Sequence, residues 1–176
     1  MKRNSKKILA LLLTAIMVMA MGITSFAAEK SVKTAPTVNV VFMVHSSSGQ
    51  TVATQRKDNI TLAENATVKD AIETAASSLN ITTNWAEDTY SDPSGWYITS
   101  CWNLSSQYID SGTTEDGNSF YESNDWILYQ ISNSDKLEVS ENPYTSSQAL
   151  SLYASNVSAI NGNTIYVVYQ KTYSEW

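Results

Sequence analysis

Two side chains could serve as a nucleophile and a base, Cys101 and His45, each the only residue of its kind among 176. A thiol beside an imidazole is the arrangement that covalent catalysis by cysteine requires. Cys101, however, lies in a strand-like run of aromatic and β-branched residues, where a thiol behaves as a small hydrophobic side chain. We therefore expect Cys101 to be buried and unreactive. A single Cys and a single His also exclude a Cys/His zinc site and an internal disulfide.

The carboxylates form no clear catalytic pattern. Hydrolysis by two carboxyl groups needs acids with different pKa values in one cleft, and nearly all acidic residues here lie in polar stretches. The run 110–118 is rich in oxygen ligands but lacks the spacing and closing Glu of an EF-hand, so we expect a solvated acidic loop. We predict that the chain is not an enzyme and requires no metal or cofactor.

The aromatic residues indicate binding instead. The chain has ten Tyr and five Trp but only three Phe, and Tyr and Trp suit surfaces where one edge of the ring is apolar and the other is wet. Several lie in or beside the segment 105–125, where they would form a flat stacking platform. Alternatively, Trp96 and Trp126 are core residues of strands. The candidate ligand-binding residues are Trp96, Trp102, Asn103, Tyr108, Tyr121 and Trp126.

The first 27 residues have the pattern of a secretory signal peptide. Four basic residues in the first seven positions precede an apolar stretch over 8–23, and small residues precede a cleavage site after Ala27. The apolar stretch is shorter than the roughly 20 residues that span a bilayer, which favours cleavage over a membrane anchor. We expect a secreted bacterial protein with a signal peptide at 1–27, a short leader at 28–36 and one domain at 37–172.

Charge limits the partners of that domain. The formal net charge is −6, although four of the 11 basic residues lie in the signal peptide, so the rest of the chain is strongly acidic. An acidic domain does not suit nucleic acid or an anionic membrane surface. The expected partners are a small planar ligand, or a protein or glycan at the cell surface.

One segment has the pattern of an amphipathic helix. Thr67 is a good N-cap residue, and Asp70 stands at the position of the capping-box acid. The apolar residues that follow share one helical face, so the helix is expected to lie on a sheet. They are Val68, Ala71, Ile72, Ala75, Ala76 and Leu79.

Strand patterns lie on both sides of this helix, which predicts an α+β fold. The first two strands are expected to form a hairpin through a turn at 46–50, and Asn161-Gly162 is a tight-turn signal before the last strand. The strands are expected over 37–44, 51–62, 96–102, 126–132 and 164–170. The segments 81–94, 105–125 and 133–163 are expected to be loops, the last with a weakly helical patch at 148–154.

Four motifs occur in order along the domain: Asn-Ala-Thr-Val-Lys-Asp-Ala-Ile at 65–72, Gly-Trp-Tyr-Ile-Thr-Ser at 95–100, Asp-Trp-Ile-Leu-Tyr at 125–129 and Asn-Gly-Asn-Thr-Ile at 161–165. In order and spacing they resemble a family of bacterial exported proteins related to the C-terminal domain of transcobalamin and intrinsic factor. The resemblance implies a β-grasp (ubiquitin-like) fold, with a mixed sheet of about five strands and one helix packed across it.

The resemblance also implies a corrinoid such as cobalamin as a ligand, although the vertebrate relatives use a separate helical domain that this chain lacks. Trp102-Asn103 replaces the Asn-Gly of the family. Because Trp does not readily adopt positive φ, we expect a different turn there. The sequence thus favours an exported, non-catalytic binding module for a corrinoid or similar planar molecule. The alternative is a cell-surface module that binds protein or glycan.

Overall fold

The computed structural model describes residues 34–142, 146 and 148–176, and Thr34–Trp176 form one compact unit. In this part of the chain, eight strands and one helix follow one another. The elements are β1 (Thr37–His45), β2 (Thr51–Thr61), α2 (Val68–Leu79), β3 (Thr83–Asp88), β4 (Gly95–Cys101), β5 (Leu104–Ser105), β6 (Gln107–Thr113), β7 (Ser119–Ser132) and β8 (Asn163–Glu175).

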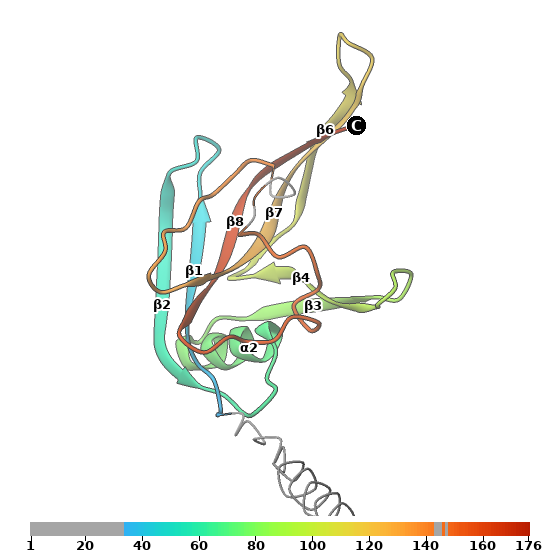
Figure 1. Ribbon diagram of the computed structural model, residues 1–176. Helices are drawn as coiled ribbons and strands as arrows, with labels where there is room; N and C mark the ends of the chain where they lie inside the picture. The colour runs from blue at the N-terminus through green and yellow to red at the C-terminus, as the bar shows by residue number, and fades with distance from the viewer. Residues whose placement is uncertain (1–33, 143–145, 147) are drawn as a thin grey trace, which may run out of the picture. The chain divides into compact units, whose positions relative to one another are not determined.

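The largest element is a mixed five-stranded sheet with the order β2-β1-β8-β7-β6 (Figure 1). β1 and β8 run parallel at its centre, while the other neighbours are antiparallel. β8 carries Ile165 and Val167 in register with Val40 and Phe42 of β1. The predicted α+β class with a mixed five-stranded sheet is confirmed.

The predicted hairpin at the start of the domain is also present. β1 and β2 pair antiparallel, and the turn between them closes with the Ser46 N–H donating to the Gln50 carbonyl over 2.8 Å. Gly49 has a φ of 76°, which a glycine adopts without a steric penalty.

The helix begins and ends as its sequence predicts. The Thr67 hydroxyl accepts from the Asp70 N–H over 3.3 Å, and the Asp70 carboxylate accepts from the Thr67 N–H over 2.7 Å, which completes a capping box. The segment 154–157 satisfies two further N–H groups of the first turn. Asn80 ends the helix in the left-handed region, at φ 56°.

The core lies between this helix and one face of the long sheet. Five of the six apolar stripe residues are at most 2% exposed, and Leu79 is partly buried. They pack against buried residues of β1 and β8, among them Phe42 and Val167. Each of the larger side chains, such as Val68, Ile72 and Phe42, contributes roughly 1.5–3 kcal/mol by leaving water, so burial of one helical face holds this region together.

A second sheet, with the order β3-β4-β5, packs beside the helix. Two aromatic residues of the long sheet hold β5 through its carbonyls: the Trp126 indole N–H donates to Leu104 over 2.9 Å, and the Tyr169 hydroxyl donates to Ser105 over 3.0 Å. Residues 83–88 form β3, so the prediction that 81–94 is a loop is wrong for these residues. β3 was missed because its polar composition hides the strand, which cross-strand pairing with β4 stabilises.

The turn between β4 and β5 contradicts a second expectation. Trp102 and Asn103 have φ values of 55° and 63°, so both adopt the left-handed conformation that a two-residue hairpin turn requires. Trp102 is half-buried and packs against the core. We conclude that this packing offsets the steric cost of positive φ at a bulky residue.

Two predicted loops also differ from the structure. Much of 105–125 forms the antiparallel pair β6 and β7, which sequence reasoning missed because the segment is mostly polar and shows no alternation of apolar and polar residues. The segment 148–154 contains no helix; the Leu150 N–H instead donates to the Leu128 carbonyl at the edge of β7. β8 continues to Glu175, three residues beyond the predicted end of the domain.

The predicted signal peptide and most of the predicted leader, residues 1–33, lie outside the described residues. Among those that are described, no helix has the length and apolar character that a membrane span needs.

Candidate functional site

The six predicted binding residues do not form one flat platform. Trp126 is 6% exposed and its ring lies against Tyr169, with 5.1 Å between ring centroids, so it is chiefly a core residue. Trp102 and Asn103 form the β4–β5 turn, where the Trp102 N–H donates to the Thr82 carbonyl over 3.0 Å. The other three occupy two further places on the surface.

Trp96 belongs to a cation–π cluster on the helix. The ammonium of Lys69 lies 5.2 Å from the ring of Trp85 and 5.5 Å from that of Trp96, and it also binds Glu73 over 2.6 Å. This contact joins the helix to β3 and β4. We therefore attribute the position of the Trp96 ring to this contact with Lys69 rather than to ligand binding.

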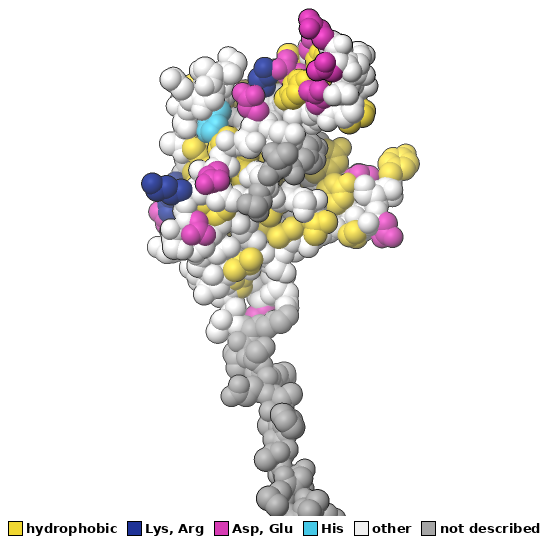
Figure 2. Space-filling view, turned by 45° about the horizontal axis from the view of Figure 1, so that its top comes forward, with side chains coloured by type: hydrophobic (Ala, Val, Ile, Leu, Met, Phe, Trp, Pro, Cys, Tyr) yellow, Lys and Arg dark blue, Asp and Glu magenta, His cyan; other side chains and the backbone are white. Residues whose placement is uncertain are grey.

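Tyr108 and Tyr121 form an exposed pair on β6 and β7. Their ring centroids are 5.8 Å apart, and their exposed fractions are 61% and 42%. Acidic side chains gather at the end of the molecule that carries β6 and the C-terminus (Figure 2). Tyr121 also lines one of the cavities described below.

The concave feature that best suits a ligand lies between β4 and β7, and we call it the β4–β7 groove. It consists of two adjoining hollows of about 540 and 450 Å³ that share Tyr97, Ile98, Trp126 and Ile127. Both volumes fall within the roughly 300–1,000 Å³ of small-molecule sites. β6 pairs with residues 119–124 of β7. Beyond residue 124, β6 does not cover this edge of β7, and the edge forms one side of the groove.

More of the residues that line the larger hollow are apolar, among them Leu128, Leu150 and Leu152. Its wall at Tyr153 is held by hydrogen bonds: the tyrosine hydroxyl donates to the carboxylate of Asp88 and lies 2.9 Å from the hydroxyl of Ser91. Asp88 also accepts from the Ser91 hydroxyl and the Tyr90 N–H, and these bonds lower its pKa to about 2, with the Tyr153 hydroxyl as the largest cause. Tyr153 also packs directly on Gly95. A Cβ atom added to Gly95 would lie 2.4 Å from the Cβ atom of Tyr153.

The smaller hollow is lined by hydroxyl groups and one carboxylate. Asp125 accepts hydrogen bonds from Ser123 and Thr172, and these two hydroxyls lie 2.8 Å apart. Because Ser123 and Thr172 are buried, at 1% and 7% exposure, they position the half-buried carboxylate rather than meet solvent. Tyr97 and Tyr121, both exposed, contribute aromatic faces.

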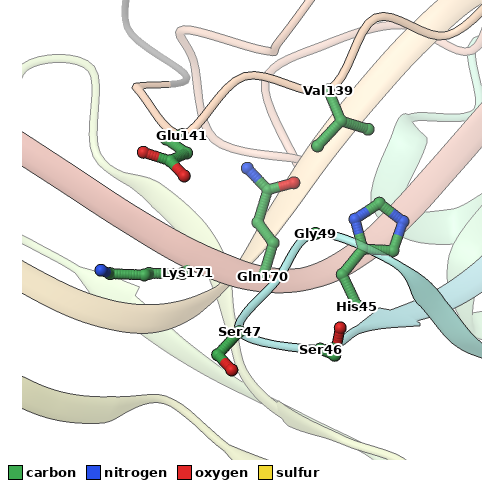
Figure 3. A pocket seen from close by; sticks show the side chains of 8 residues that line it. All are labelled: His45, Ser46, Ser47, Gly49, Val139, Glu141, Gln170 and Lys171. Carbon is green, nitrogen blue, oxygen red and sulfur yellow. The ribbon is translucent and has the colours of Figure 1, made fainter.

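A third cavity, of about 240 Å³, lies between the β1–β2 turn and the segment that carries Val139 and Glu141 (Figure 3). The side chains of His45 and Gln170 point toward that segment, and Gln170 donates to the Ser140 carbonyl over 2.7 Å. Burial lowers the pKa of His45, and neither ring nitrogen has a hydrogen-bond partner in the described part of the chain. This cavity is below the usual size of a ligand site.

The residues that suggested covalent catalysis lie apart. Cys101 is fully buried in β4, as predicted, and burial raises the pKa of its thiol to about 12, whereas His45 ends β1 in the other sheet. A thiol with a raised pKa is a poor nucleophile. The carboxyl groups whose pKa departs from its ordinary value, Asp88 and Glu175, are both shifted downward, the opposite of what a general acid needs.

Sequence reasoning thus found two residues of the groove, Tyr121 and Trp126, and missed Tyr97, Asp125 and Tyr153. Tyr97 could have been predicted from the sequence. It precedes the buried Ile98 in a strand, so its side chain lies on the opposite, exposed face. Tyr153 meets Gly95 across 58 positions of the chain, a pairing that no local pattern reveals. No protein-family model matches the chain, and no curated protein matches it.

Proposed function

We propose that the chain is an exported, non-catalytic binding module whose ligand lies in the β4–β7 groove. The observation that carries the proposal is the pair of adjoining hollows that share Tyr97 and Trp126. An open groove with exposed aromatic faces and few charged groups suits a ligand that contains rings. The signal-peptide pattern supports export.

We further propose that the domain has a β-grasp fold. Three features support this: a β1–β2 hairpin precedes the helix, the helix packs on the sheet, and the last strand returns parallel to the first at the centre. These are the features that the resemblance to the transcobalamin-related family implies.

Two ligand classes fit the proposal. A corrinoid or similar planar molecule is the ligand that the family resemblance implies, and the apolar hollow near Leu128 and Leu150 would hold part of it. A glycan or protein at the cell surface is the alternative, favoured by the hydroxyl-lined hollow around Asp125.

Titration with cyanocobalamin and with a panel of oligosaccharides, followed by Trp fluorescence, tests the site. We expect the response to be lost in Tyr97→Ala, since Tyr97 lines both hollows, and kept in Tyr90→Ala. Tyr90 is a matched control because it is fully exposed and lines neither hollow. A response abolished by Trp102→Ala but not by Tyr97→Ala would place the site at the β4–β5 turn and refute the groove.

A further inference from the structure

We infer that the occupant of the β4–β7 groove is an uncharged oligosaccharide of several linked rings that runs along β7. This inference rests on the proposed function and names its ligand class. The groove is long rather than deep: Tyr121 and Ile127, which line it, are six positions apart on one strand, roughly 20 Å. A site of that length suits a chain of rings better than one compact molecule.

The aromatic side chains of the groove favour separate rings over one broad plane. Tyr97 and Tyr153 are inclined at 43° with centroids 6.4 Å apart, so they do not share a flat surface. Tyr121 lines the smaller hollow and Tyr153 the larger one, so these two rings stand in different parts of the groove. Tilted aromatic faces can each receive the apolar face of one sugar ring, whereas a large planar macrocycle needs coplanar contact.

The polar groups suit ligand hydroxyls. Asp125 is half-buried, and its contacts with the Ser123 and Thr172 hydroxyls both fall on Oδ2. Oδ1 of Asp125 accepts no hydrogen bond from the residues that the structure describes, so it can accept one from a ligand. Ser106 and Ser174 add hydroxyls that can both donate and accept, and Thr99, which donates to the Asn84 carbonyl, adds one that can accept. A sugar offers many such groups on a ring with an apolar face.

The charge of the groove selects the type of sugar. Its charged lining residues are Asp92 and Asp125, and no Lys, Arg or His lines either hollow. An acidic glycan would bring its carboxylates or sulfates toward these aspartates without a cation to pair with them. A neutral oligosaccharide avoids this repulsion, so the lining favours uncharged sugars.

The test records NMR chemical-shift changes of the full chain with neutral hexasaccharides (cellohexaose, maltohexaose, mannohexaose and chitohexaose), with a hyaluronan hexasaccharide and with cyanocobalamin. We expect at least one neutral hexasaccharide to shift the amides of β4 and β7, and the hyaluronan fragment to leave them unchanged. Tyr97→Ala is expected to weaken binding by about tenfold and Tyr97→Phe by less than about threefold, because the phenyl ring keeps the stacking face. Asp125→Asn, which keeps the shape, is expected to weaken binding by about five- to tenfold.

The other possible results each contradict the sugar inference, the proposed function or both. If cyanocobalamin shifts the groove amides and no neutral hexasaccharide does so at millimolar concentration, the sugar inference is wrong and the proposed function stands. If no probe shifts them, the sugar inference is wrong, and so is the proposal that the ligand of this groove contains rings. Binding of the hyaluronan fragment in preference to the neutral sugars would overturn the charge argument and with it the inference.

Discussion

The two ends of the five-stranded sheet are stabilised in different ways. At one end, which we call the base, α2 covers β1, β2 and β8, and Phe42 and Ile72 are 0% exposed. At the other end, the arm formed by β6, residues 119–124 and residues 171–175, every residue of β6 is exposed. The base is held by hydrophobic burial and the arm by strand pairing and ring contacts, so one sheet contains regions of unequal stability.

The largest effect is expected from a cavity in the base. Ile72→Ala removes a fully buried side chain from the helix and should lower the free energy of unfolding by about 2–5 kcal/mol. Urea unfolding followed by Trp fluorescence measures this loss. A change below about 1 kcal/mol would show that the helix face is not the main source of stability and would remove the contrast with the arm.

Glycines distinguish the groove wall from the arm. Gly95→Ala would place a Cβ 2.4 Å from the Tyr153 Cβ, an atom close to the main chain, and should lower the free energy of unfolding by about 1–3 kcal/mol. Gly112→Ala is the matched control in the arm, where the new Cβ meets the ring edge of Phe120 at 3.0 Å and the ring can turn. Equal destabilisation of the two variants, measured by urea unfolding, would contradict this difference.

His45 lies where the base meets the arm, in the cavity that Lys171 and Glu141 also line. Burial lowers the pKa of His45 in the folded chain below the ordinary 6.5, so the unfolded chain binds the proton more readily. The stability that His45 contributes is therefore complete above pH 6.5 and is lost as the pH falls through the folded pKa, by at most about 1.4 kcal/mol per pH unit. Urea unfolding between pH 7.5 and 5 should show the loss, and His45→Gln should show a smaller slope. A slope that is the same in both proteins would exclude His45 as its source.

The smallest effect is expected in the arm. Phe120 stacks on Tyr173 with 5.9 Å between centroids and covers Gly112, so Phe120→Ala should lower the free energy of unfolding by only about 0.5–1.5 kcal/mol. Amide hydrogen exchange should quicken in β6 and stay unchanged in β1. Faster exchange in β1 as well would mean that arm and base unfold as one unit.

Sequence reasoning succeeded in the base because its signals are local. Thr67 and Asp70 mark the start of the helix, and the apolar stripe from Val68 follows a single period. In the arm and in β3, strands such as 107–113 are polar on both faces, so no alternation reveals them. They are strands because a neighbouring strand supplies their hydrogen bonds, which is a tertiary fact.

The candidate site divides in the same way. Aromatic composition pointed to the correct kind of residue, and Tyr121 and Trp126 do line the groove. Composition could not show that the Lys69 ammonium lies over the ring of Trp96 or that Tyr153 packs on Gly95. Those contacts join segments far apart in the chain, so they follow from the fold and not from any one segment.

The position of β8 has a consequence for how the chain acquires its structure during synthesis. β8 lies between β1 and β7, so the central pairing of the sheet needs residues 163–175, which leave the ribosome after all the other strands of the sheet. A nascent chain that stops before Asn163 keeps the inner edges of β1 and β7 without a partner. Until β8 is available, these two strands expose unpaired backbone groups that can pair with other chains, so the sheet is prone to aggregation at this stage.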